Sequence, residues 1–199
     1  MVELTLITTI YRIEPVMAAF TKFSPSKIVL VREDDAPEEK LKAEQMIRET
    51  IGRVVEVDTK ITSLYAVVDI ARDVVDVIEE EKAHGRNIIV NITGARKTQS
   101  LGALYGAYAR RELVEKVVYI TKEDNEVIEL PLLSFDLSKT KKRILEEINK
   151  GEVSVRNLAK RVGISRAMIY HHIRELKERG FIDDEEGLRI TTAGELAIL

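Results

Sequence analysis

The sequence predicts an α/β protein of two parts: a mostly parallel β-sheet with helices on both faces, then a small helical domain with a β-hairpin. Three observations predict this arrangement. Short apolar segments alternate with helical patterns over the first 130 residues, a glycine-bearing polar turn follows the fourth segment, and three short helical patterns punctuated by glycine follow residue 137. We expect a first domain over 1–130, a linker over 131–137 and a second domain over 138–199.

Composition narrows the class of protein. The chain has 199 residues, of which 45% are hydrophobic and 33% are charged, as expected for a globular protein. It lacks cysteine, which excludes disulfides and thiolate metal sites, and its three histidines are badly spaced for zinc. No apolar run approaches the roughly 18 residues of a membrane span, and no signal peptide is recognisable at the N-terminus. We therefore expect a cytoplasmic protein with no membrane contact, no metal and no cofactor.

Charge is unevenly distributed along the chain. The whole sequence carries 31 basic and 34 acidic residues, a net charge of −3. From Ser138 onward there are 13 basic and 10 acidic residues, so the second domain is +3 and the remainder is −6. A basic second domain permits nucleic-acid binding.

The first domain reads as four strand–helix units followed by a hairpin. The expected strands cover Glu3–Thr9, Lys27–Arg32, Val54–Asp58, Asn87–Ile92, Lys116–Thr121 and an edge strand Val127–Leu130. The expected helices cover Glu14–Phe23, a segment from Pro37 to Gly52 with Leu41, Met46 and Ile47 on one side, Leu64–Lys82, and a segment from Thr98 to Arg111. Alternation of this kind predicts a Rossmann-like sheet covered on both faces. The acids Asp69, Asp73, Asp76 and Glu79 are read as a solvated helix face rather than as metal ligands.

The stretch from Asn87 to Ser100 carries the strongest chemical signal. A buried strand runs into the turn Thr93–Lys97, and a helix opens directly after it. Free backbone N–H groups at a helix start, together with Arg96 and Lys97, suit an anion such as a phosphate. An ordinary strand–helix turn of the same composition is the alternative. Ligands of parallel sheets bind beyond the carboxyl ends of the strands, so the turn Thr8–Arg12 is expected to lie beside this one.

The second domain reads as a winged helix-turn-helix. Ser138, Ser154 and Ser165 each precede a helical pattern, and Gly151, Gly163 and Gly180 end them. The third helix places Met168, Ile169, His172, Ile173 and Leu176 on the expected core side. Phe181–Asp184 and Leu188–Thr191 form the expected wing, and a last helix begins at Thr192.

The opposite side of the third helix suits DNA. Its residues Arg166, Ala167, Tyr170, His171 and Arg174, with the capping residue Ser165, can reach base edges and phosphates from the major groove. Winged helices also serve as protein-contact modules, but a basic face favours DNA. Four acids at the tip of the wing, Asp183–Glu186, oppose phosphate contact there and leave Arg189 as the expected contact of the wing.

These features together resemble the CRISPR-associated transcriptional regulators, which join an N-terminal CARF domain to a C-terminal winged helix. The residues that carry the resemblance are Asn91–Lys97, similar to the N-x-T-G-G-x-K-type motif that follows the fourth CARF strand, and the Thr8–Thr9 turn, which matches the other ligand loop in position. Ala95 departs from this motif, because many relatives have a second glycine there.

The resemblance implies a homodimer, typically from archaea, that binds a cyclic oligoadenylate, most often cyclic tetra-adenylate, and double-stranded promoter DNA of CRISPR antiviral-defence genes. We expect no membrane partner and assign no catalytic residue. The ligand-binding residues expected on this basis are Thr8, Thr9, Tyr11, Arg12, Asn91, Thr93, Gly94, Ala95, Arg96, Lys97 and Gln99. The alternatives are an enzyme that cuts its own ring ligand, with Lys97 and Thr9 or Ser100 as aids, and a regulator that senses another phosphorylated metabolite.

Overall fold

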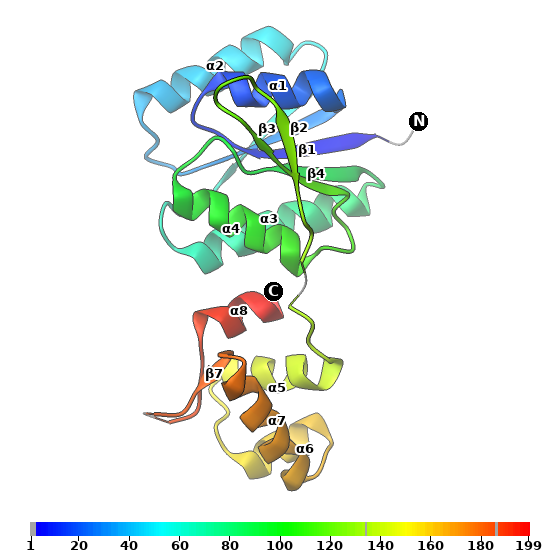
Figure 1. The fold of residues 1–199 in the computed structure, drawn as a ribbon, viewed down its shortest axis with the longest axis vertical. Helices are drawn as coiled ribbons and strands as arrows, with labels where there is room; N and C mark the ends of the chain where they lie inside the picture. The colour runs from blue at the N-terminus through cyan, green and yellow to red at the C-terminus, as the bar shows by residue number, and fades with distance from the viewer. Residues whose placement is uncertain (1–2, 134, 186) are drawn as a thin grey trace. The chain divides into compact units, whose positions relative to one another are not determined.

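The chain forms two compact units. A computed structural model describes residues 3–133, 135–185 and 187–199 of the protein (Figure 1). Unit 1 comprises 1–134 and unit 2 comprises 135–199. Each unit has its own apolar core, so each is described by itself.

Unit 1 is built on a six-stranded sheet with the order β3-β2-β1-β4-β5-β6. All neighbouring strands are parallel except β5 and β6, which pair antiparallel. The strands are β1 (Leu4–Thr9), β2 (Lys27–Arg32), β3 (Glu56–Ile61), β4 (Asn87–Asn91), β5 (Lys116–Ile120) and β6 (Val127–Leu130). The helices are α1 (Ile13–Phe23), α2 (Glu38–Ile51), α3 (Val67–Ala83) and α4 (Lys97–Ala109).

Helices cover both faces of this sheet, because successive side chains of each strand point to opposite faces. On β1, Leu6 packs in the apolar cluster that contains residues of α1 and α2, such as Val16 and Ile47. The next residue, Ile7, packs in the cluster that contains residues of α3 and α4, such as Val74. The predicted fold class, a mostly parallel sheet with a terminal hairpin, is therefore confirmed.

Two predicted boundaries in unit 1 are wrong. The third helix begins at Val67 rather than Leu64, because the Ser63 hydroxyl accepts hydrogen bonds from the N–H groups of Tyr65 and Ala66 and holds this segment in a turn. The third strand covers Glu56–Ile61 rather than Val54–Asp58, and Val54 is 77% exposed. The β3 strand pairs on one edge only, so its sequence alternates and gives a weaker signal.

The buried side of α2 is not simply the side that carries Leu41, Met46 and Ile47. Leu41 and Met46 are exposed, whereas the charged Lys40 and Glu44 are buried. Each buried charge has a partner: Lys40 Nζ lies 2.5 Å from Glu33 Oε2, and Glu44 Oε2 lies 2.6 Å from Arg32 Nε. The sequence pattern could not show these partners.

Unit 2 has the predicted winged helix-turn-helix fold. Its helices are α5 (Lys139–Asn149), α6 (Val155–Val162), α7 (Arg166–Glu178) and α8 (Thr192–Ile198), and its wing pairs β7 (Ile182–Asp183) with β8 (Arg189–Ile190). Gly163, at a left-handed φ of 81°, makes the turn between α6 and α7. The core includes Ile144, Leu158, Ile169, Leu176 and Phe181.

Local details of unit 2 differ from the prediction at two positions. The Ser138 and Ser165 hydroxyls cap α5 and α7, but the Ser154 hydroxyl makes no capping bond to α6. Met168 is 45% exposed and does not face the core.

In the predicted linker, Leu132 packs against the core of unit 1, whereas Phe135 and Leu137 pack against the core of unit 2. Residue 134 lies outside the described residues.

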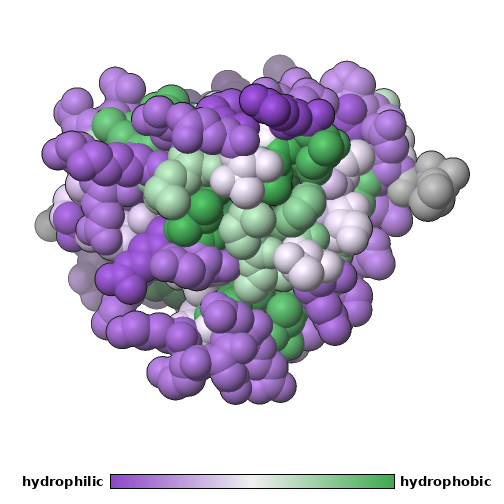
Figure 2. Space-filling view, turned by 90° about the horizontal axis from the view of Figure 1, so that it is seen from above, coloured by the Kyte–Doolittle hydropathy of each residue, from purple (hydrophilic) through white to green (hydrophobic). Residues whose placement is uncertain are grey.

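One face of the molecule gathers apolar side chains over α1 and α2. Figure 2 shows this area at the centre of the face, ringed by hydrophilic side chains. Shallow hollows here are lined by residues that include Ile13, Met17, Ala18 and Val127, and by Ala43 and Met46. Apolar surface ringed by polar residues is typical of a contact surface for another protein.

Within the described residues, no helix is long and apolar enough to span a membrane.

Candidate ligand site and nucleic-acid interface

The candidate ligand site lies where the strand order of unit 1 reverses. The chain progresses from β1 through β2 to β3 on one side, and from β4 to β5 on the other. Thr8 of β1 pairs with Asn91 of β4, so the carboxyl ends of these two strands lie side by side. The loop after β1 leads to the start of α1, and the loop after β4 leads to the start of α4. A switch point of this kind opens a crevice in which parallel sheets bind ligands.

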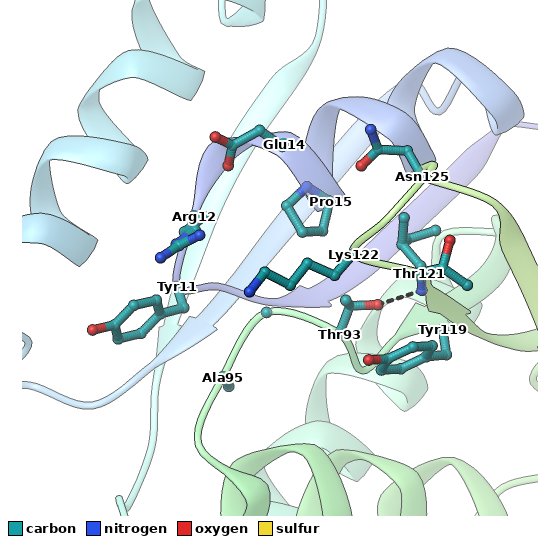
Figure 3. Close-up of a pocket in the computed structure, with 12 residues that line it drawn as sticks. Tyr11, Arg12, Glu14, Pro15, Thr93, Ala95, Tyr119, Thr121, Lys122 and Asn125 are labelled. Carbon is teal, nitrogen blue, oxygen red and sulfur yellow. Dashed lines mark hydrogen bonds between the residues drawn. The ribbon is translucent and has the colours of Figure 1, made fainter.

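A pocket of about 460 Å³ occupies this position (Figure 3). Three segments line it: the loop after β1 with the start of α1, the loop after β4, and the end of β5 with the turn that follows. The lining residues are Tyr11, Arg12, Glu14, Pro15, Thr93, Gly94, Ala95, Tyr119, Ile120, Thr121, Lys122 and Asn125. The lining side chains include the cations of Arg12 and Lys122, the rings of Tyr11 and Tyr119 and several hydroxyl groups, together with the carboxylate of Glu14.

The predicted ligand-binding residues fall into three groups. Tyr11, Arg12, Thr93, Gly94 and Ala95 line the pocket. Arg96 and Lys97 are exposed at the start of α4, outside the lining, and neither has an ion-pair partner among the described residues. Thr8, Thr9, Asn91 and Gln99 are buried, with at most 1% of each residue exposed. The side chains of Thr8, Asn91 and Gln99 are hydrogen-bonded to other side chains, so these residues stabilise the loops that line the pocket.

Gly94 is required by close approach rather than by an unusual φ. A Cβ atom at this position would lie 2.7 Å from the Thr9 carbonyl oxygen and 3.2 Å from the Tyr11 nitrogen. The two loops therefore touch backbone to backbone at Gly94. Ala95 is half-buried one residue later, where the chain accepts a methyl group.

A buried hydrogen-bond network joins three strands below the pocket. Asn91 Nδ2 donates to Thr8 Oγ1 at 3.1 Å, and Thr93 Oγ1 donates to Asn91 Oδ1 at 2.6 Å. Thr93 Oγ1 also accepts from the Ile120 N–H at 2.7 Å (Figure 3). Among the described residues, Thr9 Oγ1 is the buried side-chain polar atom that lacks a partner. Such an atom is uncommon and retains capacity for one more hydrogen bond.

A second buried cluster supports the pocket from the side of α2. Glu33 Oε2 accepts hydrogen bonds from Lys40 Nζ at 2.5 Å and from Gln99 Nε2 at 2.8 Å. Burial alone would raise the pKa of Glu33, but these hydrogen bonds outweigh it and hold that pKa below its usual value. Lys40 Nζ also lies 5.8 Å from the centroid of the Tyr11 ring, and the Tyr11 hydroxyl donates to Glu39 at 3.2 Å. Through Gln99 the cluster positions the first turn of α4, and through Tyr11 it positions a residue of the pocket wall.

Sequence reasoning missed the wall contributed by β5. Tyr119, Lys122 and Asn125 belong to the end of β5 and the turn before β6. The sequence held one usable signal: β5 is the fifth strand of the alternating pattern, so its carboxyl end must lie at the same edge as those of β1 and β4. The neighbour of β5 in the sheet, β4, was not evident from the sequence.

The candidate nucleic-acid interface is the exposed side of α7. Arg166, Ala167, Tyr170, His171 and Arg174 are all exposed, as predicted for a recognition helix. Arg166 has no ion-pair partner among the described residues, whereas Arg174 lies 4.0 Å from Glu178. Ser165 Oγ accepts from the Met168 N–H at 3.2 Å, so this hydroxyl caps the helix.

The wing is more self-contained than the sequence indicated. Arg189, the expected DNA contact, is engaged by Asp183 at 2.9 Å, and Lys177 of α7 pairs with Asp184. Two of the acids are therefore paired within unit 2.

Sequence reasoning also passed over Arg156 and Lys160 of α6, which are exposed and have no ion pair within the described residues. The helix before a recognition helix crosses the DNA backbone, and this rule could have identified them.

Fold and site together define the class: a Rossmann-like domain with a pocket at its switch point, followed by a winged helix-turn-helix domain. Residues 4–126 match the sequence model of the HFX_2341-like N-terminal family, and this chain belongs to that family. Residues 137–183 match the model described as winged helix-turn-helix DNA-binding. A search of curated proteins finds no match.

Solved structures of similar fold come from several organisms. The chain is similar to VC1899 from Vibrio cholerae, at 11% identity and a TM-score of 0.52, over 96% of this chain and 63% of that one. It is also similar to Can2 from Sulfobacillus thermosulfidooxidans in complex with cyclic tetra-adenylate, at 16% identity and a TM-score of 0.47, over 96% and 62%. A third is Enterococcus italicus Csm6 bound to a cyclic hexanucleotide analogue, at 11% and 0.49, over 91% and 57%. This chain spans less than two thirds of each of these proteins.

Proposed function

We propose that this protein is a DNA-binding regulator of CRISPR genes whose first domain senses a cyclic oligoadenylate, with cyclic tetra-adenylate as the proposed ring. The observation that carries the proposal is the pocket at the switch point between β1 and β4, in a chain that ends in a winged helix. The motif Asn91–Lys97, which resembles that of CARF domains, forms one of the loops at this pocket.

The chemistry of the site suits a ring of nucleotides. Arg12 and Lys122 line the pocket, Arg96 and Lys97 stand at its margin on the start of α4, and phosphates need such cations. The starts of α1 and α4 add free backbone N–H groups. Tyr11 and Tyr119 offer aromatic rings for bases.

We further propose that the protein acts as a homodimer. Two copies related by a two-fold axis present two such pockets to one symmetric ring, and two recognition helices to two half-sites of an operator. The apolar area over α1 and α2 supports association with another protein molecule. Measurement of the molar mass in solution by light scattering is expected to give the mass of two chains.

Native mass spectrometry of the purified protein tests the ligand class. A bound mass that matches a cyclic oligoadenylate supports the proposal. A different phosphorylated metabolite in the pocket would replace it. A linear adenylate formed from added ring would show that the protein cuts its ligand and is an enzyme as well.

A further inference from the structure

We propose that the turn between β5 and β6 is a third ligand-binding segment of the pocket, in which Lys122 binds a phosphate and Tyr119 stacks on a base. The inference rests on the proposed function, because it takes an oligonucleotide as the ligand. It assigns to this turn a role that the sequence motif, which covers only the loops after β1 and β4, does not indicate.

The position of Lys122 supports a ligand contact. Its side chain extends into the pocket, between the Tyr11 wall and the loop that carries Thr93 and Ala95 (Figure 3). Lys122 is exposed and has no ion-pair partner among the described residues. By contrast, the other cation in the lining, Arg12, lies 3.8 Å from Glu39. Lys122 is therefore the lining cation whose charge is not already matched by a carboxylate.

The turn that carries Lys122 has a defined shape. Thr121 N donates to Glu126 O at 2.9 Å, and the Thr121 hydroxyl accepts from the Glu126 N–H at 2.8 Å. The same hydroxyl donates a hydrogen bond to the Asp124 carboxylate, so that carboxylate has a partner within the turn. Asn125 adopts a left-handed φ of 57°, as tight turns require. A turn closed in this way presents Lys122 with less loss of backbone freedom on binding than an open loop would.

The turn is also linked to the motif loop. The N–H of Ile120 donates to Thr93 Oγ1 at 2.7 Å, and Thr93 connects in turn to Asn91 and Thr8. Lys122 therefore lies two residues beyond Ile120, whose backbone is hydrogen-bonded to the motif loop.

Tyr119 supplies the flat surface for a base. It is 42% exposed, although its neighbours Val118 and Ile120 on β5 are fully buried. In Figure 3 Tyr119 and Tyr11 line opposite sides of the pocket, with the Lys122 side chain between them. An aromatic ring beside a cation is the combination that binds single-stranded nucleotides, where the ring meets the base and the cation meets the phosphate.

Titration calorimetry with cyclic tetra-adenylate tests the inference on the full-length protein. Lys122→Gln is expected to weaken binding by about tenfold or more, because it removes one charge-assisted hydrogen bond to a phosphate. Tyr119→Leu is expected to weaken it by about five- to a hundredfold, whereas Tyr119→Phe keeps the affinity because it keeps the ring. Lys82→Gln is the matched control. Lys82 is an exposed lysine near the end of α3, which leads into the amino end of β4, whereas the pocket lies beyond the carboxyl ends of the strands.

The outcomes separate this inference from the proposed function. Wild-type affinity in both Lys122→Gln and Tyr119→Leu, with circular dichroism spectra unchanged, overturns the inference and leaves the proposed function intact. Absence of binding by the wild-type protein overturns both. Loss of affinity in the two variants, with Lys82→Gln and Tyr119→Phe unchanged, supports the inference.

Discussion

The hydroxyl of Thr93 accepts a hydrogen bond from the backbone N–H of Ile120 at 2.7 Å, which joins the loop after β4 to the end of β5. The same hydroxyl donates to Asn91 Oδ1, so one side chain connects two walls of the pocket to the buried network beneath. The pocket is thus held together by a residue of the recognisable motif.

Replacement of Thr93 tests this connection. Thr93→Val keeps the shape but leaves the Ile120 N–H without its acceptor, so we expect a loss of about 1–3 kcal/mol in the free energy of unfolding and weaker ligand binding. Thr93→Ser retains the hydroxyl and is expected to restore most of both. Urea unfolding and calorimetry provide the measurements. Equal behaviour of the Val and Ser variants would show that the hydroxyl has no such role.

Gly94 gives a second prediction. Gly94→Ala places a methyl group 2.7 Å from the Thr9 carbonyl oxygen, so the two loops must separate. We expect a destabilisation of about 1–3 kcal/mol and reduced ligand affinity. The matched control is Ala95→Gly, which alters the same loop without crowding it. A Gly94→Ala variant with wild-type melting temperature and affinity would contradict the close approach.

A third prediction concerns acid stability and the buried Glu81. Its carboxylate accepts hydrogen bonds from Thr5 at 2.7 Å and Arg86 at 2.8 Å, and lies 3.0 Å from Lys27 Nζ. Burial alone would raise the pKa of Glu81, but these contacts outweigh it and lower that pKa below its usual value of 4.5. The folded state therefore binds fewer protons than the unfolded state in acid, so this stabilisation is complete above about pH 4.5 and is lost as the pH falls further.

Glu81→Gln measures that contribution. We expect it to cost about 3–5 kcal/mol at neutral pH, because it leaves buried cations short of a carboxylate, and to flatten the fall in stability below pH 4.5. Glu80→Gln, on the exposed side of the same helix, is the control. Unfolding curves between pH 3 and pH 7 decide: parallel pH profiles for the Glu81→Gln variant and the wild type would exclude Glu81 as a source of acid sensitivity.

The recognition helix provides the fourth prediction. Arg166→Ala is expected to weaken binding to the protein's own promoter by about tenfold, because it removes from α7 an exposed arginine that has no ion-pair partner among the described residues. Wild-type affinity should fall steeply with salt. Lys150→Ala, at the end of α5, is the control. Binding that is independent of salt, or equal effects of the two substitutions, would contradict DNA recognition by this helix.

Local patterns predicted much of this fold, because strand–helix alternation and glycine turns are local signals. The pattern around Asn91–Lys97 likewise located one wall of the pocket. The contribution of Tyr119 and Lys122 depends on the pairing of β5 with β4, which no local pattern reports. The burial of Lys40 escaped prediction for the same reason, because its partners Glu33 and Gln99 come from other elements.

The proposed function requires that the pocket at the switch point binds a cyclic oligoadenylate. Calorimetric titration of the wild-type protein with cyclic tetra-adenylate, with Lys97→Ala in parallel, tests it most directly. We expect saturable binding near one ring per two chains, and weaker binding by the Lys97→Ala variant. Absence of binding by the wild-type protein would contradict the proposed function.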